Sequence, residues 1–231
     1  MSSTNQNPAN ALAVVRQRID VAARAAGRKP DSIKLLAVGK KHPATRLRAL
    51  YQAGQRDFGE NYVDEALEKM EALGDLSICW HFIGPVQSNK TRAIAEHFDW
   101  VHSVDRLKII RRLAEQRPHS KGPLNTLIQV NLDGETQKAG CSPDQLHELA
   151  SAIQQQPMLK LRGLMAIPAP RPCSEQQRAI LERLAHLQAE LAQTHGPLDC
   201  LSAGMSADLE AAIQAGSTLV RIGTDLFGAR P

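Results

Sequence analysis

Short apolar segments recur along this chain and alternate with longer segments that mix apolar and polar residues. Apolar runs rich in β-branched and aliphatic residues predict strands, whereas apolar residues spaced three or four apart predict helices. Eight strands are predicted in this way, over residues 33–38, 57–59, 80–84, 100–104, 124–132, 161–167, 198–202 and 218–223. The second is the weakest, because it is short and begins at the polar pair Arg56 and Asp57.

Helix-start signals stand between the predicted strands. Ser142 is placed to cap a helix, with Pro143 in its first turn and Gln145 completing a capping box, and Ser174 repeats the device. A further helix is predicted before the first strand, over about residues 11–26. The helix after Ser174 presents an apolar face typical of a helix that packs on a sheet, formed by Ile180, Leu184, Leu187 and Leu191.

Eight strand and helix alternations in 231 residues favour a single (β/α)₈ barrel, a fold of usually ~250 residues, over the alternative of an open doubly wound sheet. We therefore predict one α/β domain over residues 1–231, with residues 1–10 flexible and an extra N-terminal helix. In this barrel the chemistry takes place at the carboxyl ends of the strands, and phosphate commonly binds after strands seven and eight.

Lys40 follows the first predicted strand and is the candidate reactive amine. Side chains alternate along an extended segment, so Lys40 points the same way as Val38 while Lys41 points the other way. A Schiff base needs a neutral amine, but a free lysine has a pKa of ~10.4. An apolar strand end and a neighbouring cation would both lower it. A solvated strand-end lysine is the alternative, and Lys90 and Lys138 are competing amines.

Two segments near the C-terminus, 202–206 and 220–224, have features of a phosphate site. Gly204 and Gly223 have no Cβ to hold an anion away from the backbone, and Ser206 is placed to cap a helix whose first amides face it. Alternatively Ser206 is only a cap and Gly223 only a turn, and Asp208 would compete with an anion. Together with Lys40 and Arg221, these segments indicate pyridoxal 5′-phosphate (PLP).

Four more residues are candidates for contacts with such a cofactor. Arg221 lies in an apolar strand without an adjacent acidic residue, so it is either a ligand contact or a member of an ion pair. An arginine facing the pyridine nitrogen would leave that nitrogen unprotonated, and the cofactor would be a poor electron sink. His81 is either a core histidine or packs against the ring, and Asn61 either binds a ligand hydroxyl or caps a helix. Met165 is expected to pack at the floor of the site.

Composition excludes several functions. A net charge of +4 with 3% aromatic residues disfavours nucleic-acid binding. Four cysteines without a C-x-x-C pair indicate neither a zinc site nor a disulfide framework. With no signal sequence or membrane span expected, we predict a soluble, cytoplasmic protein. A basic run is expected to be a solvated helix face rather than a docking patch, at Arg106, Lys108, Arg111 and Arg112.

In their order along the chain, six segments resemble the pyridoxal phosphate homeostasis (YggS-like, or proline synthase co-transcribed) family. The segments are LLAVGK (35–40), FGENY (58–62), WHFIGPVQSNK (80–90), RGLMAIP (162–168), GMS (204–206) and VRIGT (220–224). The resemblance implies a barrel similar to the N-terminal domain of alanine racemase, with PLP held as an aldimine on Lys40. It also implies phosphate contacts at Ser206, Gly223 and Thr224 and a pyridine contact from Arg221. The other candidate contacts to PLP are those of Asn61, His81, Met165, Ser202, Gly204 and Met205.

This family is understood to bind, protect and deliver PLP without established turnover, with effects on amino-acid and keto-acid balance. It usually has Ser before the lysine and Thr after it, where this chain has Gly39 and Lys41. The alternative function is a PLP-dependent amino-acid racemase, for which Tyr62 is the tyrosine nearest the expected site. Another is a regulatory interaction protein whose basic helix docks partners, with PLP as the sensed ligand. For delivery, the candidate partners are apo forms of PLP-dependent enzymes. We expect a monomer.

Overall fold

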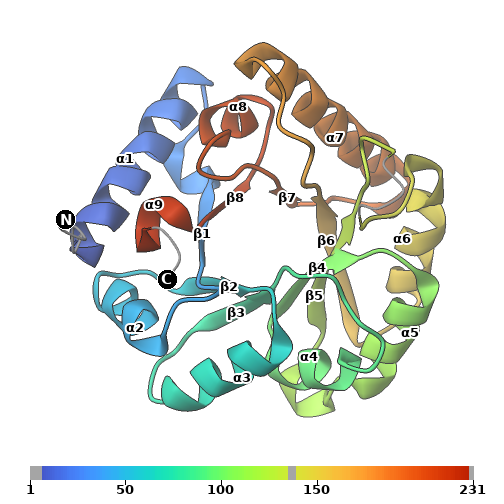
Figure 1. Ribbon diagram of the computed structural model, residues 1–231. Coiled ribbons are helices and arrows are strands. Elements are labelled where there is room, and N and C mark those ends of the chain that lie inside the picture. The colour runs from blue at the N-terminus through green and yellow to red at the C-terminus, as the bar shows by residue number, and fades with distance from the viewer. Residues whose placement is uncertain (1–6, 135–138, 229–231) are drawn as a thin grey trace.

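The computed structural model describes residues 7–134 and 139–228, which form a closed barrel of eight parallel strands in sequential order (Figure 1). β1 closes the barrel by pairing with β8, with Leu36 opposite Arg221. The predicted (β/α)₈ barrel is therefore confirmed, including the weak second strand. The strands are β1 Lys34–Val38, β2 Asp57–Glu60, β3 Cys79–Phe82, β4 Trp100–Val104, β5 Leu124–Gln129, β6 Leu159–Met165, β7 Cys200–Ser202 and β8 Leu219–Ile222.

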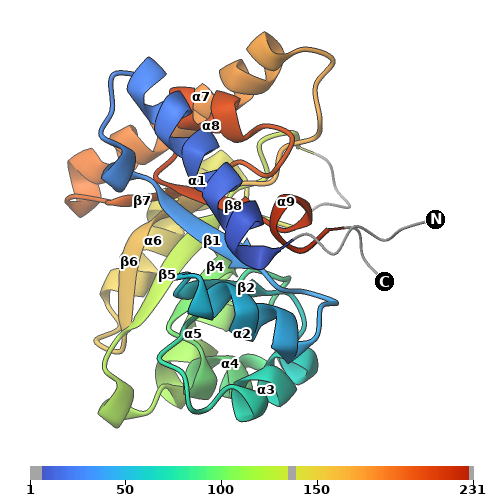
Figure 2. The same cartoon turned by 90° about the vertical axis from the view of Figure 1, so that its left-hand side faces the viewer.

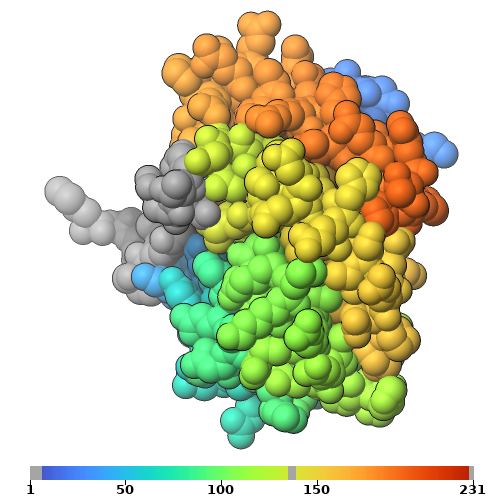
Figure 3. Space-filling view, turned by 90° about the vertical axis from the view of Figure 1, so that its right-hand side faces the viewer, coloured from blue at the N-terminus to red at the C-terminus, as the bar shows by residue number. Residues whose placement is uncertain are grey.

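Helices surround the barrel, as the side view shows (Figure 2), and α5, α6 and α7 cover one outer face (Figure 3). The α-helices are α1 Pro8–Ala25, α2 Ala44–Gln52, α3 Val63–Ala72, α4 Thr91–His97, α5 Leu107–Gln116, α6 Leu146–Gln154, α7 Ser174–His195, α8 Leu209–Gln214 and α9 Thr224–Phe227. Three 3₁₀ turns accompany them, at Pro30–Ser32, His119–Lys121 and Pro143–Gln145.

The first helix begins earlier than predicted. α1 starts at Pro8 because the Asn7 side chain accepts a hydrogen bond from the N–H of Ala9 at 3.0 Å, and proline suits the first helical turn. Residues 8–10, which were expected to be flexible, belong to this helix, and residues 1–6 lie outside the described residues; flexibility of the N-terminal segment stays a prediction. No helix in the described ranges is long and apolar enough to cross a membrane.

The two predicted capping devices have different outcomes. Gln145 accepts a hydrogen bond from the backbone N–H of Ser142 at 3.0 Å, so this capping box forms, and its 3₁₀ turn leads into α6. Ser174 does not cap α7, because Cys173 occupies the cap position and its side chain makes no capping bond. The apolar face predicted for α7 is present, with Leu184 and Leu191 buried.

Inside the barrel, apolar side chains share the interior with the buried polar residues His81, His102, Ser202 and Arg221, and ion pairs lie at the end at which the strands begin. Lys34 meets Asp57 at 3.1 Å, and Arg162 meets Asp199 at 2.5 Å. The apolar filling consists of Leu36, Val38, Ile83, Trp100, Leu127, Met165, Cys200 and Leu219. All four cysteines are free, as predicted.

Candidate functional site

An open cleft of about 240 Å³ lies at the carboxyl ends of the strands. Its wall combines one amine, one guanidinium and a few hydroxyl and amide groups with apolar side chains, which is the usual make-up of a small-molecule site. The lining residues are Val38, Lys40, His42, Asn61, Ile83, Ile167, Met205, Ser206, Ala207, Arg221, Gly223, Thr224 and Gly228.

Among the described lysines, Lys40 is the one that lines the cleft, in agreement with the strand parity. Lys41 has a φ of 64° and is exposed, and its backbone N–H donates to Glu65 at 2.5 Å, so its side chain leaves the cleft wall. The competing Lys90 forms an ion pair with Asp64 at 2.6 Å. The remaining competitor, Lys138, lies outside the described residues.

A buried charge cluster on the outer side of β1 holds the segment that carries Lys40. The ammonium of Lys69 donates to Glu60 at 2.7 Å, to Glu65 at 2.7 Å and to the carbonyl of Gly39 at 2.8 Å. Burial raises the pKa of Glu60 to about 7, although Lys69 opposes the rise. A Cβ at Gly39 would lie 2.6 Å from Glu60 Oε1, so the carboxylate occupies the space that a serine at this position would need.

Asn61 extends from the end of β2 into the cleft wall. Its side-chain oxygen is buried and has no hydrogen-bond partner among the described residues. The alternative role as a helix cap does not apply, because Tyr62 occupies the cap position of α3. An unsatisfied buried acceptor is costly, so this oxygen fits a ligand hydroxyl that would donate to it.

Arg221 reaches the cleft from β8 and is only 4% exposed. It donates to Ser202 Oγ at 2.8 Å and to the carbonyl of Ala166 at 3.0 Å, so its recorded hydrogen-bond partners are neutral. Burial lowers its pKa to about 10, which still leaves it cationic at neutral pH. A guanidinium has five N–H donors and no acceptor, so towards a ligand Arg221 acts only as a donor.

The loop after β7 is held by Asp208, which the sequence had suggested as a competitor for the anion. Asp208, not the predicted Ser206, occupies the cap position of α8. Its carboxylate accepts from the N–H of Met205 at 2.6 Å and from Gln177 at 2.9 Å. Arg18 of α1 donates to the carbonyl of Ser206 at 3.0 Å and fixes the loop from the other side.

Gly223 and Thr224 complete the cleft at the start of α9. A Cβ at Gly223 would lie 3.4 Å from the carbonyl oxygen of Val38, which is an ordinary contact, so the packing of β8 against β1 does not by itself require glycine here. Gly204 has a φ of 94°, and a Cβ there would lie 2.5 Å from the Cβ of Ala212. Its role is therefore to bring the loop against α8.

Four of the residues predicted to contact a cofactor do not line the cleft. His81, Met165 and Ser202 are fully buried inside the barrel, and Gly204 lies behind the loop. Their contact with a cofactor stays a prediction. Six lining residues were not among the predicted site residues, namely Val38, His42, Ile83, Ile167, Ala207 and Gly228. Ile83 follows the inward parity of His81, and Val38 that of Lys40, so both were accessible to the alternation argument, whereas the other four lie outside the strands and have no such signal.

Comparison with known proteins agrees with this geometry. Residues 11–231 match the family model described as alanine racemase, N-terminal domain. A pyridoxal phosphate homeostasis protein of Pseudomonas aeruginosa is 58% identical over 219 residues, which cover 95% of this chain and 94% of that protein. One of Escherichia coli K12 is 51% identical, covering 96% of both chains.

Solved structures show the same relationship. PipY of Synechococcus elongatus PCC7942, solved with PLP bound, is 37% identical with a TM-score of 0.84, covering 96% of this chain and 100% of PipY. Alanine racemase of Streptomyces lavendulae shares the fold at 19% identity and a TM-score of 0.76, and the match covers 96% of this chain but 58% of the racemase. The chain therefore belongs to the pyridoxal phosphate homeostasis protein family, whose barrel is the alanine racemase N-terminal domain.

Proposed function

We propose that this protein binds PLP in the cleft, attaches it covalently to Lys40, and stores it for transfer to other proteins inside the cell. The observation that carries the proposal is the convergence of Lys40, Asn61 and Arg221 in one cleft with the loops at Ser206 and Thr224. The names of the relatives and the PLP-bound structure of PipY support the choice of cofactor.

Each polar group of PLP has a suitable group in the cleft. Lys40 supplies an amine for the aldehyde, and Asn61 Oδ1 supplies an acceptor for the ring hydroxyl. Arg221 donates to an unprotonated pyridine nitrogen, which keeps the ring a poor electron sink. Ser206, Gly223 and Thr224 stand where phosphate commonly binds in this fold, after strands seven and eight. PLP would supply a reversible carbonyl group there.

The shape of the site suits exchange of the cofactor. A hollow of about 220 Å³ shares Asn61, Ile83 and Ile167 with the cleft, and another of about 260 Å³ shares Met205 and Ala207. An incoming amine therefore has room beside Lys40. Storage on one lysine lowers the concentration of free aldehyde, which reacts with many amines, and amine exchange releases it.

Racemase activity, the alternative, needs a second base on the opposite face of the ring. Among the described residues, no tyrosine lines the cleft. Tyr62 is 53% exposed at the rim, and the hydroxyl of Tyr51 accepts a hydrogen bond from the N–H of Ser77 at 3.3 Å. We therefore propose that the protein carries PLP and does not turn over an amino acid.

Absorption spectroscopy with added PLP, borohydride reduction and peptide mass mapping test the attachment. We expect a reduced adduct on Lys40 that is absent in Lys40→Ala and retained in Lys41→Ala, the matched neighbour. An adduct chiefly on Lys41 or Lys90 would contradict the assignment of the lysine, and no adduct would refute covalent binding.

Transfer is tested separately by mixing the PLP-loaded protein with an apo form of a PLP-dependent enzyme and following the recovery of that enzyme's activity. Storage with delivery predicts faster recovery than slow dissociation of PLP into buffer allows. Recovery no faster than that dissociation would refute delivery, and racemisation of an added amino acid would refute the non-catalytic role.

A further inference from the structure

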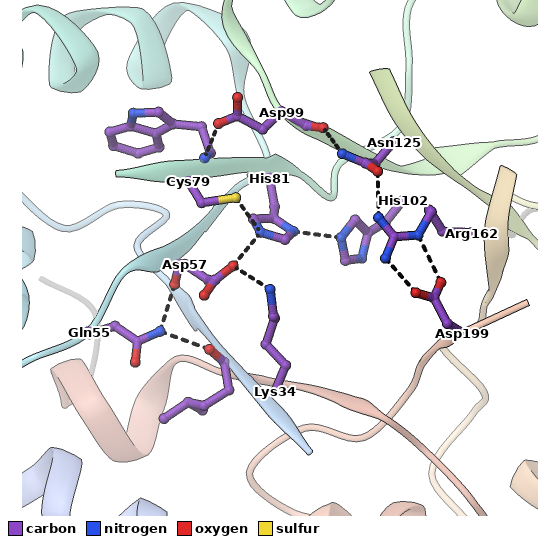
Figure 4. A network of polar contacts seen from close by, with 12 residues as sticks. Lys34, Gln55, Asp57, Cys79, His81, Asp99, His102, Asn125, Arg162 and Asp199 are labelled. Carbon is purple, nitrogen blue, oxygen red and sulfur yellow. Dashed lines mark hydrogen bonds and ion pairs between the residues drawn. The ribbon is translucent and has the colours of Figure 1, made fainter. Parts of the chain in front are cut away.

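A continuous series of hydrogen bonds leads from Arg221 at the cleft to Asp57 at the other end of the barrel. Five residues on five strands form this series, which we call the relay. Its links are Arg221 Nη1 to Ser202 Oγ (2.8 Å), Ser202 Oγ to His102 Nδ1 (3.0 Å), His102 Nε2 to His81 Nδ1 (2.9 Å) and His81 Nε2 to Asp57 Oδ1 (3.0 Å). Figure 4 shows the part from Asp57 through His81 to His102.

The two ends determine the direction of every link. A guanidinium can only donate, and an ionised carboxylate can only accept. Asp57 therefore takes the Nε2–H of His81, which leaves the Nδ1 of a neutral His81 as an acceptor. His102 must then donate from Nε2 and accept at Nδ1. The Ser202 hydroxyl donates to His102 and accepts from Arg221, so all four bonds point the same way, from Arg221 to Asp57.

The opposite direction leaves a repulsion at one end and an unused donor at the other. The thiol of Cys79 lies 3.4 Å from His81 Nε2 and could donate there only if that nitrogen carried no hydrogen. The nitrogen lone pair would then face the Asp57 carboxylate at 3.0 Å. At the other end, the Ser202 oxygen would accept from both His102 and Arg221, so its own hydrogen would have no acceptor among the described residues. Asp57 is also paired with a cation, because the Nζ of Lys34 lies 3.1 Å from its Oδ1, and this ion pair is the end of the relay.

Burial supports neutral histidines. His81 and His102 are both 0% exposed, and Trp100 stacks on His81 with 5.3 Å between ring centroids. Burial lowers the pKa of both histidines, most strongly that of His102. Burial raises the pKa of Asp57, but the bond from His81 and the charge of Lys34 outweigh this effect, so the pKa is lowered and the carboxylate stays ionised.

The relay crosses the barrel. It passes along the neighbouring strands β2, β3 and β4 and then spans the interior to β7 and β8. Asp57 does not line the cleft and instead lines a hollow at the opposite opening, together with Lys34. No carboxylate hydrogen-bonds to Arg221 among the described residues: Asp208 acts on its charge without a direct bond, and the hydrogen-bond series ends at Asp57.

From this geometry we infer that four residues are positioning residues for Arg221, namely Asp57, His81, His102 and Ser202. They fix the orientation of its guanidinium and keep one of its N–H groups bonded to Ser202 instead of to a ligand in the cleft. A change at Asp57 then alters PLP binding at the opposite end of the barrel. This inference rests on the proposed binding of PLP in the cleft, but the direction of the relay is a property of the cofactor-free protein.

The first test needs neither a variant nor PLP. Long-range ¹H–¹⁵N spectra of the cofactor-free protein labelled at histidine reveal which ring nitrogen carries hydrogen. We expect His81 and His102 to be neutral and to carry hydrogen on Nε2 at pH 7. A hydrogen on Nδ1 of either ring, or a doubly protonated ring, would overturn the inference whatever happens to PLP.

The second test compares Asp57→Asn with Asp199→Asn by PLP titration and by the visible absorption maximum of the bound cofactor. Both variants remove one carboxylate charge at the same end of the barrel, but Asp199 pairs with Arg162 outside the relay. We expect Asp57→Asn to raise the dissociation constant roughly fivefold, the size of one weakened hydrogen bond, and to shift the absorption maximum.

Asp199→Asn should keep both values close to wild type. Equal effects of the two variants, or none, would overturn the positioning role. If the wild-type protein binds no PLP, the proposed function fails, while the histidine spectra still decide whether the relay exists. The ring nitrogens assigned in the first test also remain decisive if Asp57→Asn does not fold.

Discussion

Replacement of Glu60 by glutamine should change how stability depends on pH. Burial raises the pKa of this carboxyl from 4.5 to about 7, so the folded protein binds its proton more tightly than the unfolded chain does. A group of this kind contributes most stability below the unfolded pKa, and the contribution is lost as the pH rises through the folded value. Glu60→Gln has no such group, and Lys69 keeps Glu65 as a partner.

The size of the effect follows from the pKa values. A rise from 4.5 to about 7 corresponds to about 3 kcal/mol of stability lost between pH 4.5 and pH 8 in the wild type. Urea unfolding at half-unit steps between pH 5 and pH 8.5 gives the free energy of unfolding for both proteins. The free energy of unfolding of the variant minus that of the wild type should rise by about 2 to 3 kcal/mol from pH 5 to pH 8.5. Groups that titrate equally in both proteins cancel from this difference.

Glu68→Gln is the matched control, since it removes an exposed carboxylate from α3, the helix that carries the partners of Glu60, Lys69 and Glu65. Its difference from the wild type should hardly change with pH. If the unfolding free energies of Glu60→Gln and wild type run parallel from pH 5 to pH 8.5, Glu60 has an ordinary pKa and the argument from its burial is wrong.

Three further changes have defined outcomes. Gly163→Ala should lower the free energy of unfolding, measured in urea, by at least about 3 kcal/mol. The residue has a φ of 148°, and a Cβ there would lie 2.0 Å from the carbonyl oxygen of Cys200, so a near-neutral result would contradict this contact between β6 and β7. Arg117→Met should lower the free energy of unfolding by about 2 to 4 kcal/mol in the same assay, because the two buried backbone carbonyls that accept from Nη1 of Arg117 would lose their donor. A decrease below about 1 kcal/mol would contradict the importance of these bonds. Arg18→Met should weaken binding of PLP roughly threefold or more, because the carbonyl of Ser206 loses one partly buried hydrogen bond, and unchanged affinity would refute the role of α1 in holding this loop.

The features that could be predicted from the sequence are those with a local cause. The order of strands and helices follows from apolar periodicity. The inward direction of Lys40 follows from alternation along β1, and the closeness of Lys40 to Arg221 follows from barrel closure. These arguments need no knowledge of side chains on other strands.

The remaining features depend on partners far away in the sequence. Serine and aspartate both cap helices, so the residue types at 206 and 208 do not decide which of them caps α8. In the structure Asp208 occupies the cap position, and its carboxylate also accepts a hydrogen bond from Gln177 on α7. His102 meets Ser202 across 100 residues of sequence, so nothing near either residue indicates the contact. From the sequence, Lys69 would be expected to pair with Glu65, which lies four residues earlier on the same helix. Its bonds to Glu60 and to the carbonyl of Gly39 depend on the packing of α3 against β1 and β2.

The pairing of β1 with β8 has a consequence for the order of events during synthesis. Lys40 leaves the ribosome long before Arg221, Gly223 and Thr224, which lie on β8 and at the start of α9. Strand β1 has no neighbour on one side until β8 has been made, and Arg18 of α1 has no ion pair with α9 until Asp225 has been made. The cleft can therefore assemble only once β8 and α9 have left the ribosome, and a chain truncated before β8 offers its lysine without the rest of the site.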